Sequence, residues 1–419
     1  MTCSLMKLFH AADLHLDSPM RGLVAYEEAP IEELRLATRV ALGNLVDTAV
    51  DEAANAVLLA GDIFDGDWPH YGTGVHFVSE MGRLREADIP VVIVTGNHDA
   101  ESKLTKSLRL PANVHMLDTR KPQTVTFDEL GLAVHGQGYA TPAVVDDLSA
   151  GYPAPMADMI NVGLLHTSAD GRPGHERYAP CSVNALAQRG YDYWALGHIH
   201  RREVLSTEPP IVFPGNLQGR GLRETGAKGA TLIEVAHDGT ITFEHRTLDC
   251  VRWELIEVDA AGCAAPDDVL ELVAMAVRQA ACDARDRLLA VRVVITGVTD
   301  AHAMLVADSE RLRYDVVAAA ADVAGAQVWI EGVRLKTTSP RDLAHGGDDA
   351  VGELVRELEE LCGCDGSIQE LMAALAPLAK VLPPSVLAGF DPADRETVRA
   401  LMTDVSRSLP VALLERTGS

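Results

Sequence analysis

Residues 5–23, "LMKLFHAADLHLDSPMRGL", begin as an apolar run and end in polar residues. The apolar run is typical of a buried β-strand, and strands buried on both faces are usually apolar throughout. Here Asp13 and His15 follow the run one residue apart, and Asp17 comes shortly after them. We expect Asp17 to cap the turn before Pro19. A single Asp-x-His can be a polar strand end, so its meaning depends on the rest of the chain.

Four more candidate strands in the first 250 residues end in the same way. They are "AVLLAGD" (56–62), "IPVVIVTGNHD" (89–99), "INVGLLHTS" (160–168) and "YDYWALGHIH" (191–200), and they bring Asp62, Asp65, Asn97, His98, Asp99, His166, His198 and His200. Helical stretches alternate with these strands, which predicts βαβ units. In open α/β sheets the loops at the carboxyl ends of the strands form the ligand crevice. We therefore expect these polar side chains to converge on one place.

The residue types at these strand ends predict a metal site. Buried carboxylates and imidazoles without a counter-charge are costly, and a metal ion removes that cost. Two carboxylates, one amide and four imidazoles, with no thiolate, suit Mn²⁺, Fe²⁺ or Zn²⁺. Seven ligands are too many for one tetrahedral ion, so we expect two ions, with Mn²⁺ preferred. Such a pair, about 3.5–4 Å apart, stabilises the attacking and leaving oxygens of an in-line displacement at phosphorus.

The motifs D-x-H, G-D-x-x-D, G-N-H-D, a later His and G-H-x-H occur here in that order. Over about residues 5–250 they resemble the calcineurin-like metallophosphoesterase superfamily. Within it, "HAADLHLDSP", "AGDIFD", "GNHD" and "LGHIH" followed by "PGNLQGR" resemble the DNA repair exonuclease branch, of SbcD or YhaO type. The resemblance implies a four-layer α/β/β/α sandwich with the metal ions at one edge.

The resemblance also implies a role for each polar residue. The first metal would bind Asp13, His15 and His200, the second would bind Asn97, His166 and His198, and Asp62 would bridge both. A hydroxide between the metals would attack phosphorus. His98 would stabilise the transition state and protonate the leaving oxygen, and Asp65 would orient His98. Some repair nucleases carry His in place of Asp65, so a second histidine proton donor is in question here. A helix N-cap or turn residue is the alternative interpretation of Asp65, and Asp99 is expected to tie down its own loop.

The substrate class is a weaker inference. The stretch "GDIFDGDWP" lacks the Arg with which serine/threonine phosphatases of this superfamily grip phosphate. For DNA, basic residues follow the motifs, which suits contact with a phosphate backbone. A solvated charged face is the alternative interpretation of each cluster. The candidates for DNA binding are Lys103, Lys106, Arg109, Arg201, Arg202, Arg220, Arg223 and Lys228.

Three functions remain open from the sequence. The leading hypothesis is a dinuclear-metal-dependent phosphodiesterase, a DNA exonuclease or endonuclease subunit in DNA repair. The second is a phosphodiesterase or phosphatase for small nucleotides or other phosphoesters. The third is a non-catalytic scaffold that binds an ATPase. A complete ligand set argues against the scaffold, and the formal net charge of -25 argues somewhat against DNA, although a local site can oppose the overall charge.

Composition bounds the setting of the protein. The chain has 419 residues, 47% of them hydrophobic, which suffices for two or three domains. It has no apolar run of about 18 residues and no basic stretch before an apolar signal core, so we expect no membrane span. Seven scattered cysteines fit reduced thiols and a cytoplasmic location. Cys362-x-Cys364 has no second pair at zinc-finger spacing.

The chain divides into three predicted parts. Residues 1–250 form the metallophosphoesterase (nuclease) domain, and residues 251–340 form a smaller αβ capping domain with helices near 267–282 and 308–323. Residues 341–419 form a helical C-terminal region interrupted at Pro383-Pro384. The resemblance implies that these helices dock a coiled-coil, SMC-like ABC-type ATPase. Packing within their own domain is the alternative, and a homodimer is a further partner to consider.

Overall fold

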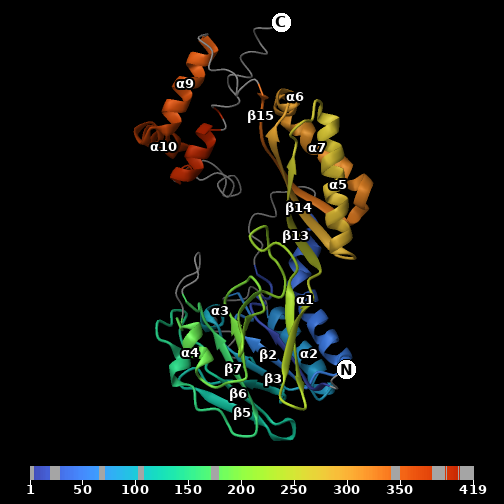
Figure 1. The fold of residues 1–419 in the computed structure, drawn as a ribbon, viewed down its shortest axis with the longest axis vertical. Coiled ribbons are helices and arrows are strands. Elements are labelled where there is room, and N and C mark those ends of the chain that lie inside the picture. Colours follow the sequence, from blue (N-terminus) through green and yellow to red (C-terminus); the bar gives the residue numbers. More distant parts are fainter. Residues whose placement is uncertain are drawn as a thin grey trace. The chain divides into compact units, whose positions relative to one another are not determined.

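The computed structural model describes two compact units. It describes residues 4–18, 29–65, 71–101, 108–170, 179–340, 350–379, 392, 394–403 and 405. One unit holds Met1–Met20 and Pro30–Trp253, and the other includes Glu254–Ser419 (Figure 1). The division into three parts stays a prediction.

The first sheet of the larger unit carries three of the five motif strands. Its order is β12-β11-β1-β2-β3-β4. The four strands from β1 to β4 run parallel. Strand β11 is antiparallel to β1 and forms a hairpin with β12 through a turn that contains Asp238 and Gly239. The bounds are β1 (Ser4–Ala11), β2 (Ala56–Ala60), β3 (Val91–Val94), β4 (Val114–Met116), β11 (Gly229–Ala236) and β12 (Ile241–Thr247).

The second sheet carries the other two motif strands, β7 and β8. Its order is β5-β6-β7-β8-β10-β9, and β6, β7, β8 and β10 run parallel. The edge strands β5 and β9 are antiparallel to their neighbours. The bounds are β5 (Gln123–Phe127), β6 (Leu132–Gly136), β7 (Ile160–His166), β8 (Tyr193–Gly197), β9 (Glu203–Thr207) and β10 (Pro210–Phe213).

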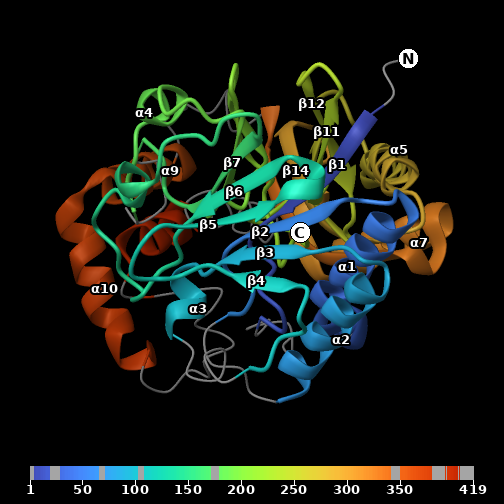
Figure 2. The ribbon, with the colours of Figure 1, turned by 90° about the horizontal axis from the view of Figure 1, so that it is seen from below.

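Alternation along the strands builds four layers. Phe9 packs outward with helices α1 (Ile31–Asp51) and α2 (Gly72–Glu86), while its neighbour Leu8 faces the second sheet, because successive side chains of a strand point to opposite faces. On β8, Tyr193 lies between the sheets and Trp194 packs outside, with helix α4 (Val183–Ala187). Figure 2 shows the strands of the two sheets stacked, with α1 and α2 beside the first. The predicted α/β/β/α sandwich is confirmed.

Short helices complete the connections of this unit. Helix α3 (Asn97–Glu101) follows β3 directly, so the G-N-H-D motif begins a helix. Two short 3₁₀ helices, η3 (Asp128–Leu130) and η4 (Leu148–Gly151), lie in the connections that flank β6. The motif residues are therefore placed on strand ends and on the first turn of a helix.

The second unit contains a three-stranded sheet covered by helices. The order is β13-β14-β15, and Val273 and Val277 of α5 and Val316 of α7 pack on it with Val291 and Ile295. The bounds are β13 (Val251–Asp259), α5 (Pro266–Ala284), β14 (Leu288–Val298), α6 (His302–Ala307), α7 (Ser309–Ala324), η5 (Gly325–Gln327) and β15 (Val328–Thr338). Both helices expected from the sequence in this region are present.

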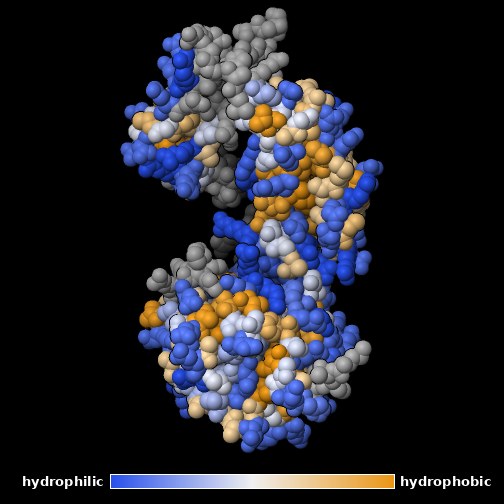
Figure 3. Space-filling view, in the orientation of Figure 1, coloured by the Kyte–Doolittle hydropathy of each residue, from blue (hydrophilic) through white to orange (hydrophobic). Residues whose placement is uncertain are grey.

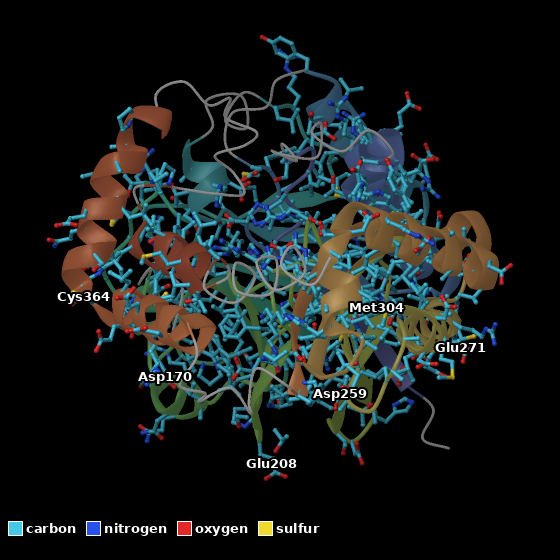
Figure 4. All side chains as sticks on the ribbon, turned by 90° about the horizontal axis from the view of Figure 1, so that it is seen from above. Asp170, Glu208, Asp259, Glu271, Met304 and Cys364 are labelled. Atoms are coloured by element: carbon cyan, nitrogen blue, oxygen red, sulfur yellow. The ribbon has the colours of Figure 1, made fainter. Side chains whose placement is uncertain are left out.

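Helices α9 (Ala350–Gly363) and α10 (Asp365–Ala379) follow in the C-terminal region. Cys364, at the turn between them, is exposed (Figure 4). Pro383-Pro384 lies outside the described residues. Among the helices that the structure describes, each is too short or too polar to cross a membrane.

Candidate metal centre

The five motif strands bring their polar residues to one edge of the two sheets. Strands β1, β2 and β3 run parallel in the first sheet, and β7 and β8 in the second, so their carboxyl ends lie together. The loop after β1 lies against the loop after β2, because Asp13 N donates to Gly61 O and His15 N to Asp62 O, both at 3.0 Å. The motifs are thus joined by backbone hydrogen bonds.

Four of the predicted ligands have an unusual backbone. The φ angles of Asp13, His15, Asp62 and His198 are 52°, 43°, 52° and 106°. A left-handed conformation at such residues costs roughly 1–3 kcal/mol each and is found mostly at functional sites. Gly61 has a φ of 91°, and a Cβ there would overlap the ring of His166. The backbone at this edge therefore adopts unfavourable conformations that direct the side chains of the predicted ligands toward one another.

All seven predicted metal ligands lie in one cluster. Asp13, His15 and His200 can each offer an atom within 4.8 Å of the others, and so can Asp62, His166 and His198. Asn97 joins the second group, with Oδ1 at 3.1 Å from His166 Nε2. The assignment of ligands to two ions stays a prediction, and these two groups support it.

Asp62 lies between the two groups. Its Oδ1 accepts a hydrogen bond from His98 N at 3.0 Å. Its Oδ2 lies 3.8 Å from His15 Nε2 and 3.5 Å from His166 Nε2. One carboxylate oxygen thus faces a histidine of each group, which is the arrangement that a bridging ligand needs.

The histidine rings are held so that their Nε2 atoms face the centre. His166 Nδ1 lies 2.9 Å from Ala60 O, and His200 Nδ1 lies 2.8 Å from Glu224 Oε1. Each Nδ1 therefore carries the ring proton and donates a hydrogen bond to that acceptor. Each Nε2 keeps its lone pair. The Nε2 atom of His166 then faces Asn97 Oδ1 and Asp62 Oδ2, which are also acceptors. Acceptors turned toward one another fit a cation between them.

Burial gives the same conclusion. Burial, followed by the charge of Asp62, raises the pKa of Asp13 well above its usual value, and burial raises the pKa of Asp62 to about 6. Burial also lowers the pKa of His166 to about 3. Without a cation the cluster therefore holds charge poorly, and a divalent ion would supply the missing counter-charge. The residues present fit a metal centre.

His98 stands at the rim of the cluster. Its side chain is 38% exposed, and its Nδ1 lies 3.0 Å from Asp65 Oδ1. Asp65 also receives a hydrogen bond of 2.6 Å from Ser18 Oγ. Burial raises the pKa of Asp65, but hydrogen bonds from His15, His98 and Ser18 lower it further, so that the pKa lies well below its usual range. Asp65 is therefore an anion close enough to orient His98, and that role stays a prediction.

The structure separates the basic residues proposed for DNA. Arg109, Arg201 and Arg223 are exposed. Arg202 is partly buried and donates to Thr231 Oγ1 at 2.8 Å. Lys228 is 6% exposed and donates from Nζ to His200 O at 2.9 Å, so it lies inside the domain and its assignment to DNA loses support. Arg220 pairs with Glu224. Lys103 and Lys106 lie outside the described residues.

Two further aspartates have roles that differ in detail from those expected. Asp17 binds Arg39, with Nε to Oδ1 at 2.7 Å, and accepts a second bond from Thr73, so it ties the β1 loop to α1 and α2 rather than capping a turn. Asp99 accepts from Gly96 N in its own loop and also from Ile63 N and Phe64 N in the β2 loop. Both carboxylates therefore join separate segments of the site.

Two contributors to the site, Ser18 and Glu224, were not predicted from the sequence. Ser18 bonds Asp65, and Glu224 holds the ring of His200. Glu224 follows His200 by 24 positions in the segment "GRGLRETGAKG", of which the sequence singles out only the basic residues. A carboxylate among glycines and arginines has no spacing that would mark it as a partner of a histidine.

A four-layer sandwich that gathers Asp, His and Asn side chains at the ends of parallel strands is the arrangement of a metallophosphoesterase fold. Residues 6–202 match the family described as "Calcineurin-like phosphoesterase", and residues 253–338 match "Metallophosphoesterase YhaO, middle domain". Residues 6–202 are therefore a calcineurin-like metallophosphoesterase domain, of a family of phosphoester hydrolases that bind divalent metal ions.

Curated relatives extend this placement. The chain is 35% identical over 258 residues to the uncharacterized metallophosphoesterase YhaO of Bacillus subtilis, covering 61% of this chain and 63% of that protein. It is 26% identical over 282 residues to the DNA double-strand break repair protein Mre11 of Methanopyrus kandleri, covering 61% and 60%. The corresponding protein of Saccharolobus solfataricus is 25% identical, covering 56% and 61%. The chain thus spans about three fifths of the length of these relatives.

A solved structure of a dimetal phosphatase from Danio rerio is also similar. It is 13% identical, with a TM-score of 0.35, over 59% of this chain and 98% of that one.

Proposed function

We propose that this chain is a dinuclear-metal-dependent phosphodiesterase that acts on DNA as a nuclease subunit in DNA repair. The observation that carries the proposal is His98, an imidazole at the rim of a complete donor set, held by Asp65 at 3.0 Å. A purely structural metal site has no need of such a group. A hydrolase can use such a group to give a proton to the leaving oxygen.

The residues of the site divide the work. When bound, two divalent ions, which we expect to be Mn²⁺ with Fe²⁺ or Zn²⁺ as alternatives, supply an activated water and neutralise charge on the phosphoester. The seven Asp, His and Asn donors hold those ions. Asp65 holds the Nδ1 side of His98, so Nε2 is the nitrogen that protonates the leaving oxygen. The 38% exposure of His98 leaves room for a substrate to reach it.

Two observations support DNA as the substrate. Three relatives at 25–26% identity are named DNA double-strand break repair proteins. Arg109, Arg201 and Arg223 are exposed, and each follows a metal motif or its neighbouring loop in the sequence. Exposed arginines can contact phosphates without reading bases, which suits a nuclease of low sequence specificity.

A phosphodiesterase for small nucleotides is the second candidate. It is favoured by the inward placement of Arg220 and Lys228, which removes two of the eight cations proposed for DNA, and by the net charge of -25. The same donors and His98 would serve that substrate equally well.

An activity panel separates these candidates. The full chain with Mn²⁺ is given single- and double-stranded DNA, cyclic nucleotides and simple phosphomonoesters. Cleavage of DNA at rates well above those of the small substrates supports the nuclease. Cleavage of cyclic nucleotides alone assigns the second candidate, and no hydrolysis of any phosphodiester contradicts the proposal.

We also propose that the C-terminal helices dock an ABC-type ATPase. In Figure 3 hydrophilic side chains prevail on the visible face of α9 and α10, with a smaller apolar area among them. Leu361 of α9 is 46% exposed, and amphipathic helices of this kind bind grooves of partner proteins. Truncation after residue 340 should leave hydrolysis of a small diester intact and remove association with the ATPase. Loss of the metal site or of solubility would assign these helices to the core.

A further inference from the structure

We infer that Arg220, Glu224 and Lys228 are positioning residues for the metal ligand His200, and not part of a DNA-binding surface. This inference deepens the proposed function and rests on it for the chemistry, but it concerns how this chain prepares its own metal ligand. The three residues recur every fourth position in the segment that follows β10. From the sequence alone, two of them fell among the cations proposed for DNA.

The segment holds His200 at two points. Glu224 Oε1 lies 2.8 Å from the ring nitrogen Nδ1, and the Nζ of Lys228 donates to the backbone oxygen of His200 at 2.9 Å. The contact with Glu224 sets the tautomer and the orientation of the His200 ring. The contact with Lys228 fixes the position of the His200 backbone carbonyl. His200 Nε2 is thereby left facing Asp13 Oδ1 at 3.8 Å and His15 Nε2 at 3.1 Å.

Glu224 is itself held firmly. Its Oε2 accepts from Asn216 Nδ2 and from the backbone nitrogen of Arg220, both at 2.8 Å, and Arg220 Nη2 donates to Oε1 at 2.8 Å. A carboxylate with this many donors cannot turn away from the histidine.

Arg220 extends the network to the other side of the centre. Its Nη1 lies 3.3 Å from Ser18 Oγ and 3.9 Å from Asp65 Oδ2. Asp65 in turn faces His15 Nδ1 at 3.5 Å and His98 Nδ1 at 3.0 Å. One guanidinium therefore connects the carboxylate behind His200 with the carboxylate behind His15 and His98. Most of the N–H groups of Arg220 donate hydrogen bonds within the site, and its side chain is 21% exposed. Arg220 therefore supports neighbouring residues of the site and does not form part of a surface for DNA.

The physical consequence concerns one metal position more than the other. A carboxylate that accepts a hydrogen bond from Nδ1 raises the basicity of Nε2 and fixes the orientation of the ring. Loss of such a partner typically costs 10- to 100-fold in metal affinity. Glu224 acts on His200, whereas His166, in the second donor group, is held by the backbone oxygen of Ala60. Changes in the segment should therefore weaken one ion selectively.

The test is a Mn²⁺ titration of the metal-free full chain, followed by electron paramagnetic resonance of free Mn²⁺. Glu224→Gln keeps the shape of the side chain and removes its charge. Arg220→Lys keeps the positive charge and removes the forked guanidinium group. Lys228→Met keeps the approximate length of the side chain and removes its ammonium group. The matched control is Glu244→Gln, which makes the same chemical change at a side chain 55% exposed that pairs with Arg246 on β12. Thermal unfolding of each metal-free variant reports its folding.

We expect Glu224→Gln to raise the dissociation constant of one Mn²⁺ by 10- to 100-fold and to leave the other within about threefold. Arg220→Lys and Lys228→Met should weaken the same ion by smaller factors, and Glu244→Gln should change neither. Wild-type affinity for both ions in Glu224→Gln overturns the inference. So does equal loss at both positions with a lowered unfolding temperature, which would indicate general support of the fold. The titration needs no substrate, so a protein that binds two ions and hydrolyses nothing would contradict only the proposed function.

Discussion

The Nε2 atoms of His15 and His200 lie 3.1 Å apart, with their other ring nitrogens turned toward carboxylates. Two unprotonated Nε2 atoms at this distance would present lone pairs to each other, which is unfavourable unless a cation lies between them. The relationship joins residues 185 positions apart in the chain. The fold therefore brings two of the predicted metal ligands, with Asp13, within reach of one ion.

Replacing Asp62 by Asn should weaken both metal positions. Asp62 Oδ2 faces a histidine of each donor group, and a neutral amide attracts two cations much less than a carboxylate does. Elemental analysis after dialysis should find fewer than two ions per chain. Asp47→Asn, at a side chain 57% exposed, is the control and should keep the wild-type metal content. Two ions retained by Asp62→Asn would contradict a bridging role.

His98→Ala should abolish most hydrolysis and retain the metal ions. The ring acts on the leaving oxygen, and such general acids contribute roughly 10²- to 10⁴-fold in rate. Asp65→Asn should give a smaller loss, because it removes the anion that orients the ring at 3.0 Å but leaves the ring in place. Rates on a small diester, measured with metal content, check both. Full activity in His98→Ala would rule out its role as proton donor.

Gly96→Ala should destabilise the protein and disturb its metal site. A Cβ at this position would overlap Asp62, both at Oδ1 and at the backbone nitrogen, so the carboxylate must move. Overpacking of this kind costs about 1–3 kcal/mol. In Gly82→Ala, inside α2, the added Cβ meets open space, and a gain of roughly 0.5–1 kcal/mol is expected. Urea unfolding of the two variants measures the difference, and equal stability would show that the β3 loop can yield.

Joint replacement of Arg109, Arg201 and Arg223 by Ala should weaken DNA binding and flatten its dependence on salt. Removing one arginine–phosphate interaction reduces the slope of log K against log salt by about 0.9. Hydrolysis of a small diester should stay nearly unchanged. Joint replacement of Arg35, Arg85 and Arg120, which are exposed as well, is the control for net charge. An equal loss of DNA binding in the control would mean that overall charge and not these three sites governs binding.

His10 should make stability depend on pH. Burial lowers its pKa to about 3, and its ring nitrogens contact Tyr193 Oη at 3.1 Å and Leu196 O at 3.0 Å. In the unfolded chain its pKa returns to about 6.5, so protons bind the unfolded chain first. The stability that neutral His10 contributes is present above about pH 6.5 and is lost as the pH falls toward 3.

The slope of unfolding free energy against pH tests this in metal-free protein. Between about pH 6 and pH 4, His10→Gln should show a shallower slope than the wild type, whatever its absolute stability. His237→Gln, at an exposed position, should keep the wild-type slope. An unchanged slope in His10→Gln would mean that His10 takes up its proton in the folded state within this range.

The sequence by itself determined the class of fold, the family resemblance and the residues that lie together at one edge of the sheets. Apolar runs ending in Asp, His or Asn are local patterns, and the parallel order of strands β1, β2, β3, β7 and β8 turns each strand end toward the same edge. The α/β/β/α sandwich and the family were confirmed. Predicting the seven candidate ligands needed no knowledge of distant contacts, because each lies within a few residues of the strand that positions it.

Only the tertiary structure decided how those ligands are held. Arg220 and Ser18 are 202 positions apart, and Glu224 lies 24 positions from His200 in a segment without regular structure. Contacts of this kind depend on how separate loops meet, and neither residue type nor local period encodes them. Because residue type does not encode such contacts, the sequence does not distinguish Arg220 and Lys228 from Arg223. Burial and partners, which arise when the chain packs, direct the first two inward and leave the third exposed.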